Sequence, residues 1–365
     1  MKNNTSIGVV GDLHVGARGG SDIFRQHIKQ VLFDTIKNFS DNGVTYVLFL
    51  GDFFDVRRAT YNKDIHWIVN EFIPFVESLN IKIIILAGNH DIALKESTEI
   101  TSLDLFAQSD SFIIVKQPTR LNVLNIEIDV YPWICGDTAE SAEKLVNSKP
   151  DNVEYAFGHF EFAGAKMYKF SEAEEGHDAS IFKAYKEVFT GHFHHASDYG
   201  NVSYLGSLLY LNWSDFLDYD DDNRGSYILN LQTGDKEFFV NDQCLFIEES
   251  YDDSDNNDPT KQDWSHLTDK FVKVYVKSKE RPRIFNKFIQ QLKEIPMLSL
   301  SIIDETLDDE SEDKVTVVIT EAELSIDTSG AMKKYVESAQ YENEKDLVLY
   351  LDEKYTTAIN EQINM

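Results

Sequence analysis

Residues 81–91 read Ile-Lys-Ile-Ile-Ile-Leu-Ala-Gly-Asn-His-Asp, an apolar run that ends in a glycine and three polar side chains. Such a run is typical of a buried strand that turns sharply at its carboxyl end. Four more apolar runs end in the same way: residues 6–10 before Gly-Asp-Leu-His, 44–50 before Gly-Asp, 153–157 before Gly-His and 187–190 before Gly-His-Phe-His. Because ligands bind outside the carboxyl ends of strands in an open α/β sheet, we expect the five ends to converge.

The first two thirds of the chain alternate between apolar runs and amphipathic stretches, which indicates an α/β fold. Residues 23–39 and 64–79 carry apolar side chains at the three- and four-residue spacing of helices. Further strands are predicted at 125–131, 202–205, 226–231 and 236–240. We therefore expect residues 1–248 to form one domain.

A second, smaller domain is predicted after an acidic segment. Residues 249–269 begin with the polar, proline-containing stretch EESYDDSDNNDPTKQ, so we interpret them as a linker. A small α+β domain at 270–325 follows, with strands at 271–276, 298–303 and 315–320 and a helix at 282–295. Residues 326–365 are expected to form a helical tail.

The side chains at the five strand ends are those that bind transition metals. They are Asp12, His14, Asp52, Asn89, His159, His192 and His194. Seven such side chains could hold two cations if one carboxylate bridges, and bridging by Asp52 would give each cation four ligands. A mixture of His, Asp and Asn favours Mn, Fe or Zn over Mg or Ca. Each motif alone is weak evidence, and the ordered set carries the interpretation.

The overall charge of the chain, taken alone, argues against nucleic acid as a binding partner. The chain has 63 acidic and 34 basic residues, a formal net charge of −29, whereas proteins that bind nucleic acid usually rely on Lys and Arg. Two cysteines are too few for a disulfide framework, which favours a reducing compartment. We find no apolar run of the ~20 residues that a membrane helix needs.

The ordered motifs Asp-x-His, Gly-Asp, Gly-Asn-His-Asp, Gly-His and Gly-His-x-His resemble those of the calcineurin-like metallophosphoesterases. Within that family the chain looks most like the SbcD-type nuclease subunits of DNA repair and recombination complexes, including those of T-even-like phages. The closer features include Asp12-Leu-His14-Val-Gly16 and Gly51-Asp52-Phe-Phe-Asp55. The resemblance implies a two-layered α/β sandwich with a dinuclear metal centre, a small α+β capping domain and a helical tail that reaches an ATPase.

The resemblance also implies roles for single residues. One divalent ion would be held by Asp12, His14, Asp52 and His194, and the other by Asp52, Asn89, His159 and His192; we expect manganese in both places. The catalytic residues would be His90, which acts on the leaving oxygen, and Asp91, which orients it. Asp55 stands where some relatives have histidine.

We accordingly expect a manganese-dependent DNA exonuclease and endonuclease that works with an SbcC-type ATPase, as a homodimer, in the cytoplasm (of the host, if a phage encodes it). Candidate DNA-contacting residues near the motifs are Arg18, Arg57, Arg58, Lys95, Lys166 and Lys169. Two alternatives remain: a small-molecule phosphodiesterase or phosphatase, and a non-catalytic scaffold for an ATPase. The complete ligand set argues against the scaffold, and the capping domain and tail argue against a stand-alone phosphatase.

Overall fold

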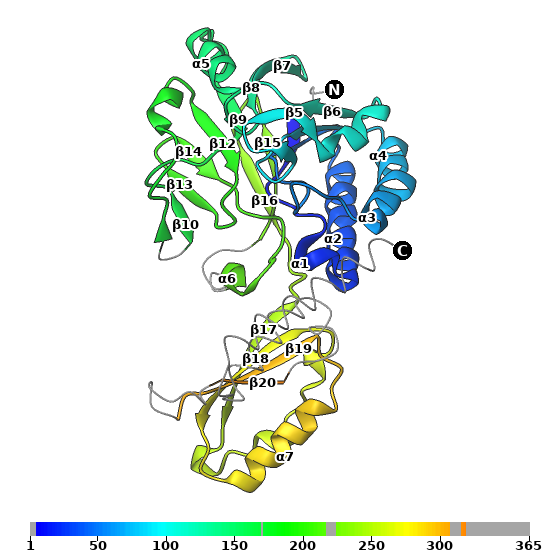
Figure 1. The fold of residues 1–365 in the computed structure, drawn as a ribbon, viewed down its shortest axis with the longest axis vertical. Helices are drawn as coiled ribbons and strands as arrows, with labels where there is room; N and C mark the ends of the chain where they lie inside the picture. Colours follow the sequence, from blue (N-terminus) through cyan, green and yellow to red (C-terminus); the bar gives the residue numbers. More distant parts are fainter. Residues whose placement is uncertain (1–4, 169–170, 217–223, 307–314, 319–365) are drawn as a thin grey trace, which may run out of the picture. The chain divides into compact units, whose positions relative to one another are not determined.

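The computed structural model describes residues 5–168, 171–216, 224–306 and 315–318 (Figure 1). The chain divides into two compact units, with the boundary between Cys244 and Leu245. Among the helices of the described ranges, none is both long and apolar enough to cross a membrane.

The first unit contains two six-stranded sheets. In the first sheet β1, β2, β3 and β6 are parallel, and β15 and β16 continue it in antiparallel fashion beside β1. Its spatial order is β16 (Lys236–Val240), β15 (Gly225–Asn230), β1 (Ser6–Val10), β2 (Tyr46–Phe49), β3 (Lys82–Leu86) and β6 (Phe112–Val115). The strands predicted in these regions are confirmed.

The second sheet has a parallel centre with one antiparallel strand at each edge. Its spatial order is β13 (Ser197–Tyr199), β14 (Val202–Tyr204), β12 (Glu187–Gly191), β9 (Tyr155–His159), β8 (Ile126–Tyr131) and β7 (Thr119–Val123). Strands β14, β12, β9 and β8 are parallel, while β13 and β7 run against their neighbours.

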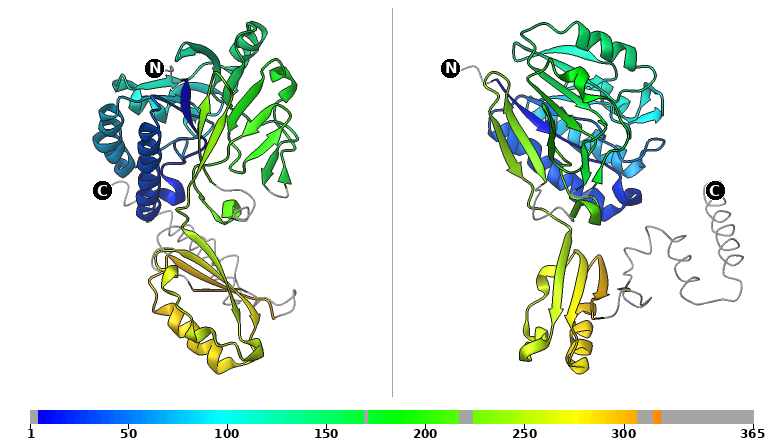
Figure 2. Two further views of the ribbon diagram at one scale, coloured as in Figure 1. Left: turned by 180° about the vertical axis from the view of Figure 1, so that it is seen from behind. Right: turned by 90° about the vertical axis from the view of Figure 1, so that its left-hand side faces the viewer.

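The two sheets face each other across a shared apolar core (Figure 2). Burial of large aliphatic and aromatic side chains is the main favourable contribution to such packing. Buried side chains from both sheets meet there, among them Val9, Leu48, Leu86, Ile128, Phe157 and Phe189. This arrangement confirms the predicted two-layered sandwich and sets the carboxyl ends of strands from both sheets beside one another.

Helix α2 (Asp22–Asp41) covers the outer face of the first sheet. Gly8 in β1 makes this packing possible, because a Cβ at that position would lie 2.7 Å from the ring of Phe39. The predicted helix at 64–79 is interrupted: α3 (Asn62–Trp67) and α4 (Ile73–Ser78) are joined by a π-helical turn, η1 (Ile68–Phe72). Pro74 explains the break, since it lacks the N–H that a regular α-helix requires.

Shorter elements complete the first unit. They are α1 (Ala17–Gly20), β4 (Ile92–Leu94), β5 (Ser97–Thr101), η2 (Ser102–Gln108), α5 (Ala139–Asn147), β10 (Lys166–Tyr168), β11 (Ser171–Glu172), η3 (Ala179–Phe182) and α6 (Trp213–Phe216).

The second unit is a four-stranded sheet packed on one helix, in the order β17 (Phe246–Asp252), β18 (Phe271–Ser278), β19 (Ser299–Asp304) and β20 (Val315–Val318). Helix α7 (Pro282–Lys293) connects β18 to β19 and buries Phe288 and Leu292. The predicted tail at 326–365 lies outside the described residues.

The interpretation of residues 249–269 as a linker is wrong. Strand β17 pairs in parallel with β18 over its whole length, and the turns η4 (Ser254–Asn256), η5 (Pro259–Lys261) and η6 (Ser265–Leu267) connect the two. The acidic composition was misleading because Asp253 is 1% exposed. Its carboxylate accepts hydrogen bonds from the main-chain N–H groups of Glu280 and Arg281, at 2.8 and 2.9 Å. The unit thus starts at Leu245, well before the predicted residue 270.

We predict that Asp253→Ala destabilises the second unit by about 3 kcal/mol, because it leaves buried N–H donors without acceptors. Hydrogen–deuterium exchange of peptides from β17 and β18 would measure the loss as faster exchange. The matched control is Glu280→Ala, in the connection between β18 and α7 whose main-chain N–H groups bond Asp253, because the Glu280 side chain is exposed. Equal protection in both variants would contradict this account of the loop.

Candidate metal centre

The five predicted strand ends meet at one place, but they do not come from one open sheet. Asp12, Asp52 and Asn89 follow β1, β2 and β3 of the first sheet. His159 ends β9 and His192 follows β12, both in the second sheet. An apolar run predicts a buried strand but not the sheet to which it belongs, so the expectation of a single sheet is corrected while the convergence is retained.

The backbone at these ends takes conformations that L-residues rarely adopt. His14, Asp52 and His192 have φ values of 55°, 46° and 91°. Left-handed conformations at such residues cost on the order of 1–3 kcal/mol each and concentrate at functional sites. The glycines that precede Asp52 and Asn89 let neighbouring groups approach closely. A Cβ on Gly51 would lie 2.4 Å from Nδ1 of His159, and one on Gly88 would lie 2.2 Å from the carboxylate of Asp52.

Two histidine rings face each other through their Nε2 atoms. Nε2 of His14 lies 3.0 Å from Nε2 of His194. The other ring nitrogen of each faces a carboxylate: Nδ1 of His194 lies 3.1 Å from Asp215, and Nδ1 of His14 lies 3.1 Å from Asp55. A carboxylate beside Nδ1 favours a proton on that nitrogen and leaves Nε2 with a lone pair. The space between the two rings therefore requires a positive charge, either a proton or a metal ion.

A second set of acceptors converges beside the first. Nδ1 of His159 donates to the carbonyl oxygen of Leu50 at 2.7 Å, so Nε2 is turned toward the site. That Nε2 lies 2.9 Å from Oδ1 of Asn89 and 3.3 Å from a carboxylate oxygen of Asp52. Nδ1 of His192 also lies 3.0 Å from Oδ1 of Asn89. Nitrogen lone pairs, an amide oxygen and a carboxylate suit a transition-metal cation.

Asp52 is common to both sets. One group of ligand atoms that lie within 4.8 Å of one another comprises Asp12, His14 and Asp52, and another comprises Asp52, His159 and His192. Asp12 is fully buried, and its carboxylate accepts the main-chain N–H of His192 at 3.0 Å. The donor set thus fits divalent cations, with Asp52 placed to touch two of them.

Ionisation of the buried side chains reflects this need for positive charge. Burial lowers the pKa of His14, but the hydrogen bond to Asp55 and the charges of Asp52 and Asp12 outweigh burial and raise that pKa to about 9. Burial also opposes protonation of His159, yet the charge of Asp52 raises its pKa to about 9. Divalent cations that bind here would displace protons from both rings, so binding weakens as pH falls.

The expected orientation of His90 by Asp91 is wrong. The Asp91 carboxylate accepts main-chain N–H groups of Phe54 at 2.9 Å and Gly88 at 2.9 Å, so it shapes the loops around the site. His90 Nδ1 instead donates to the main-chain carbonyl of Asp55 at 2.6 Å. Adjacent side chains point in different directions, and Asp91 turns into the protein, where it is fully buried.

Sequence reasoning missed three residues of the centre. Asp215 is buried, and burial raises its pKa, but its hydrogen bond with His194 and nearby positive charges, including Arg224, lower the pKa overall. Arg224 also donates to the main-chain oxygen of Asp215 at 3.1 Å. The ring of Trp133 lies 5.1 Å from that of His192. None of the three has a local motif; only the fold brings them to the site.

The six candidate DNA-contacting residues divide into different environments. Arg18 donates to the carbonyl oxygen of Leu211 at 3.2 Å, which ties it to the fold. Arg58, Lys95 and Lys166 are exposed, Arg57 is half-buried, and Lys169 lies outside the described residues.

We predict that Asp52→Ala loses both metal ions, whereas His194→Ala loses one, because Asp52 belongs to both groups of ligand atoms. Metal content would be measured by mass spectrometry after dialysis against Mn²⁺. Identical loading of the two variants would contradict a shared role for Asp52.

Comparison with known proteins agrees with this geometry. A family model described as Calcineurin-like phosphoesterase matches residues 5–220, more than half of the chain. The protein named Exonuclease subunit 1 of Enterobacteria phage T4 is 27% identical over 311 residues, which cover 84% of this chain and 87% of that relative. The strand-end acceptors and the family match lead to one conclusion: the chain belongs to the calcineurin-like phosphoesterase family, a family of phosphoester hydrolases that bind divalent metals.

Proposed function

We propose that this chain is a metal-dependent DNA nuclease that hydrolyses phosphodiester bonds, with exonuclease activity on duplex ends and endonuclease activity on single strands. The proposal rests mainly on two groups of metal-ligand side chains that share Asp52. In each group, ligand atoms lie so close together that a positive charge is needed between them. The similarity to a protein named as an exonuclease subunit supports DNA as the substrate.

Two manganese ions are proposed for the two acceptor sets. The first set comprises Asp12, His14, Asp52 and His194, and the second comprises Asp52, Asn89, His159 and His192. When bound, such ions neutralise the charge of a phosphodiester and supply an activated water. The residues behind the ligands would hold the rings in the orientation for binding, as the contact of Asp215 with Nδ1 of His194 indicates.

His90 is proposed to assist departure of the leaving oxygen. Its main-chain N–H donates to Oδ1 of Asp52 at 2.8 Å, and its Nδ1 donates to the carbonyl of Asp55. Its ring centroid lies 5.0 Å from that of His14. The remaining nitrogen, Nε2, can donate a proton or a hydrogen bond to an oxygen that becomes negative as the bond breaks.

The net charge of −29 does not exclude a polyanionic substrate. Two divalent ions would place four positive charges where the phosphate must lie, and a local charge of that size dominates the field in a site. Exposed Arg58, Lys95 and Lys166, with half-buried Arg57, could extend this field along a DNA backbone.

The relative is named as a subunit, which supports the proposal of a partner protein. We propose an SbcC-type ATPase as that partner, a homodimer as the nuclease unit, a role in DNA recombination and repair, and the cytoplasm of a phage-infected host as the location. Contact through residues 326–365 remains a prediction from sequence, because they lie outside the described residues.

We predict that the purified protein degrades linear duplex DNA and cleaves single-stranded DNA when Mn²⁺ is added, and that neither reaction proceeds with a chelator. A chromogenic phosphodiester serves as the small-molecule comparison. Rapid hydrolysis of that compound with no cleavage of either DNA would favour a small-molecule phosphodiesterase instead. No hydrolysis of any of the three would favour a scaffold.

We predict that His90→Ala retains metal, thermal stability and DNA binding but cleaves DNA at least roughly a hundredfold more slowly. A nitrophenolate leaving group should recover part of the loss, because it departs with less help. The control is His66→Ala, an exposed histidine of α3. Loss of metal from His90→Ala, or cleavage near that of the unaltered protein, would falsify the catalytic assignment.

A further inference from the structure

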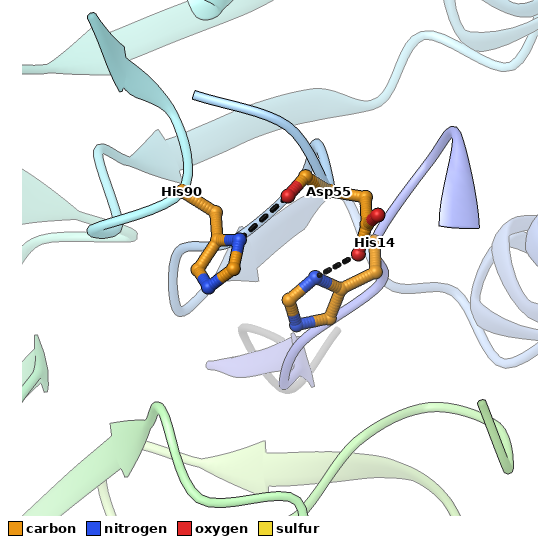
Figure 3. Close-up of side chains that lie close together, drawn as sticks. All are labelled: His14, Asp55 and His90. Carbon is orange, nitrogen blue, oxygen red and sulfur yellow. Dashed lines mark hydrogen bonds and ion pairs between the residues drawn. The ribbon is translucent and has the colours of Figure 1, made fainter. Parts of the chain in front are cut away.

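Asp55 contacts two histidines of the centre with two different groups (Figure 3). Its carboxylate oxygen Oδ1 lies 3.1 Å from Nδ1 of His14. Its main-chain oxygen accepts a hydrogen bond from Nδ1 of His90 at 2.6 Å. One residue therefore touches both a candidate metal ligand and the proposed donor to the leaving group.

Both contacts use the nitrogen that does not face the metal centre. With Nδ1 of His14 directed at Asp55, its Nε2 lies 3.0 Å from Nε2 of His194 and 3.8 Å from a carboxylate oxygen of Asp52. Figure 3 shows that the Nε2 atoms of His14 and His90 both point away from Asp55, to the same side. The contacts with Asp55 thus leave the Nε2 atoms of both rings free to face the metal centre.

The backbone of Asp55 is fixed firmly enough to hold two rings. Its main-chain N–H donates to the carbonyl of Val15 at 3.0 Å, and the N–H of Val15 donates to the carbonyl of Phe53 at 2.8 Å. The N–H of Phe54, the preceding residue, donates to the Asp91 carboxylate. Asp91 therefore acts on His90 indirectly, by securing the segment whose carbonyl holds that ring.

We propose that Asp55 is a positioning residue for the reaction proposed above, on which this inference rests. Its carboxylate fixes His14 with Nε2 toward the metal, and its carbonyl fixes the ring of His90. Carboxylates behind metal-binding histidines set the tautomer and raise ligand basicity, and their loss typically weakens metal affinity about 10–100-fold. The carbonyl survives any side-chain substitution, so the two roles can be separated.

The experiment measures Mn²⁺ affinity by titration calorimetry on full-length protein freed of metal, without DNA. We expect Asp55→Ala to weaken binding about 10–100-fold, and Asp55→Asn to weaken it less, because the amide oxygen can still accept the Nδ1 proton. Asp215→Asn is the positive comparison, since Asp215 stands behind His194 in the same way.

Glu161→Gln is the matched control for charge. Its side chain is 35% exposed, against 31% for Asp55, and its carboxylate lies 3.9 Å from Nε2 of His192, too far for a hydrogen bond. Removing that charge should change affinity by no more than about threefold, as for other solvent-screened pairs. A loss in Glu161→Gln equal to that in Asp55→Ala would attribute the effect to charge alone and overturn the positioning role.

Cleavage at saturating Mn²⁺ completes the test. Asp55→Ala should stay within about tenfold of the unaltered protein, far above His90→Ala, because the carbonyl that holds His90 remains. Unchanged affinity, or a loss at saturating metal as large as that of His90→Ala, would overturn the proposal. Should Asp55→Ala fail to fold, Asp55→Leu decides by the same affinity measurement, because it removes the acceptor at similar side-chain volume; unchanged affinity there would overturn the proposal. An unaltered protein that binds Mn²⁺ but cleaves no DNA would contradict only the proposed function.

Discussion

The Nε2 atoms of His14 and His194 face each other at 3.0 Å, and a carboxylate stands behind each ring. Such a contact is favourable only with a positive charge between the two nitrogens. The same need recurs where Nε2 of His159 faces Asn89 and Asp52. Protons can supply that charge, as the raised pKa values of His14 and His159 indicate, and a divalent cation that binds here would take their place.

The fold supplies what this compensation requires. Two sheets packed through a common core bring strand ends from distant parts of the chain to one edge. Glycines at 51 and 88 let neighbouring ligands approach within distances that a Cβ would forbid. Left-handed backbone at His14, Asp52 and His192 costs stability that the sandwich core must offset. The strain thus supports the view that these ends are arranged for binding rather than for stability.

Much of this could be predicted because the signals are local. Apolar runs ending in glycine and a polar side chain located β1, β2, β3, β9 and β12 and the seven candidate ligands. Pairing between distant segments left no such signal, so the division of these strands between two sheets was not foreseen. Asp215 contacts His194 although the two are 21 residues apart in the sequence, and no motif around Asp215 indicates this contact. The segment around Asp253 was misinterpreted because acidic composition does not reveal a carboxylate that is buried against main-chain N–H groups. The role expected for Asp91 came from the resemblance, and its carboxylate is likewise bonded to main-chain N–H groups.

The central claim is that the two acceptor sets hold two cations that share Asp52. Anomalous diffraction from crystals grown with Mn²⁺, recorded on both sides of the manganese absorption edge, tests it most directly. The account predicts two anomalous peaks, both in contact with the Asp52 carboxylate, one next to His14 and His194 and the other next to His159 and His192. A single peak, or peaks that do not touch Asp52, would contradict it.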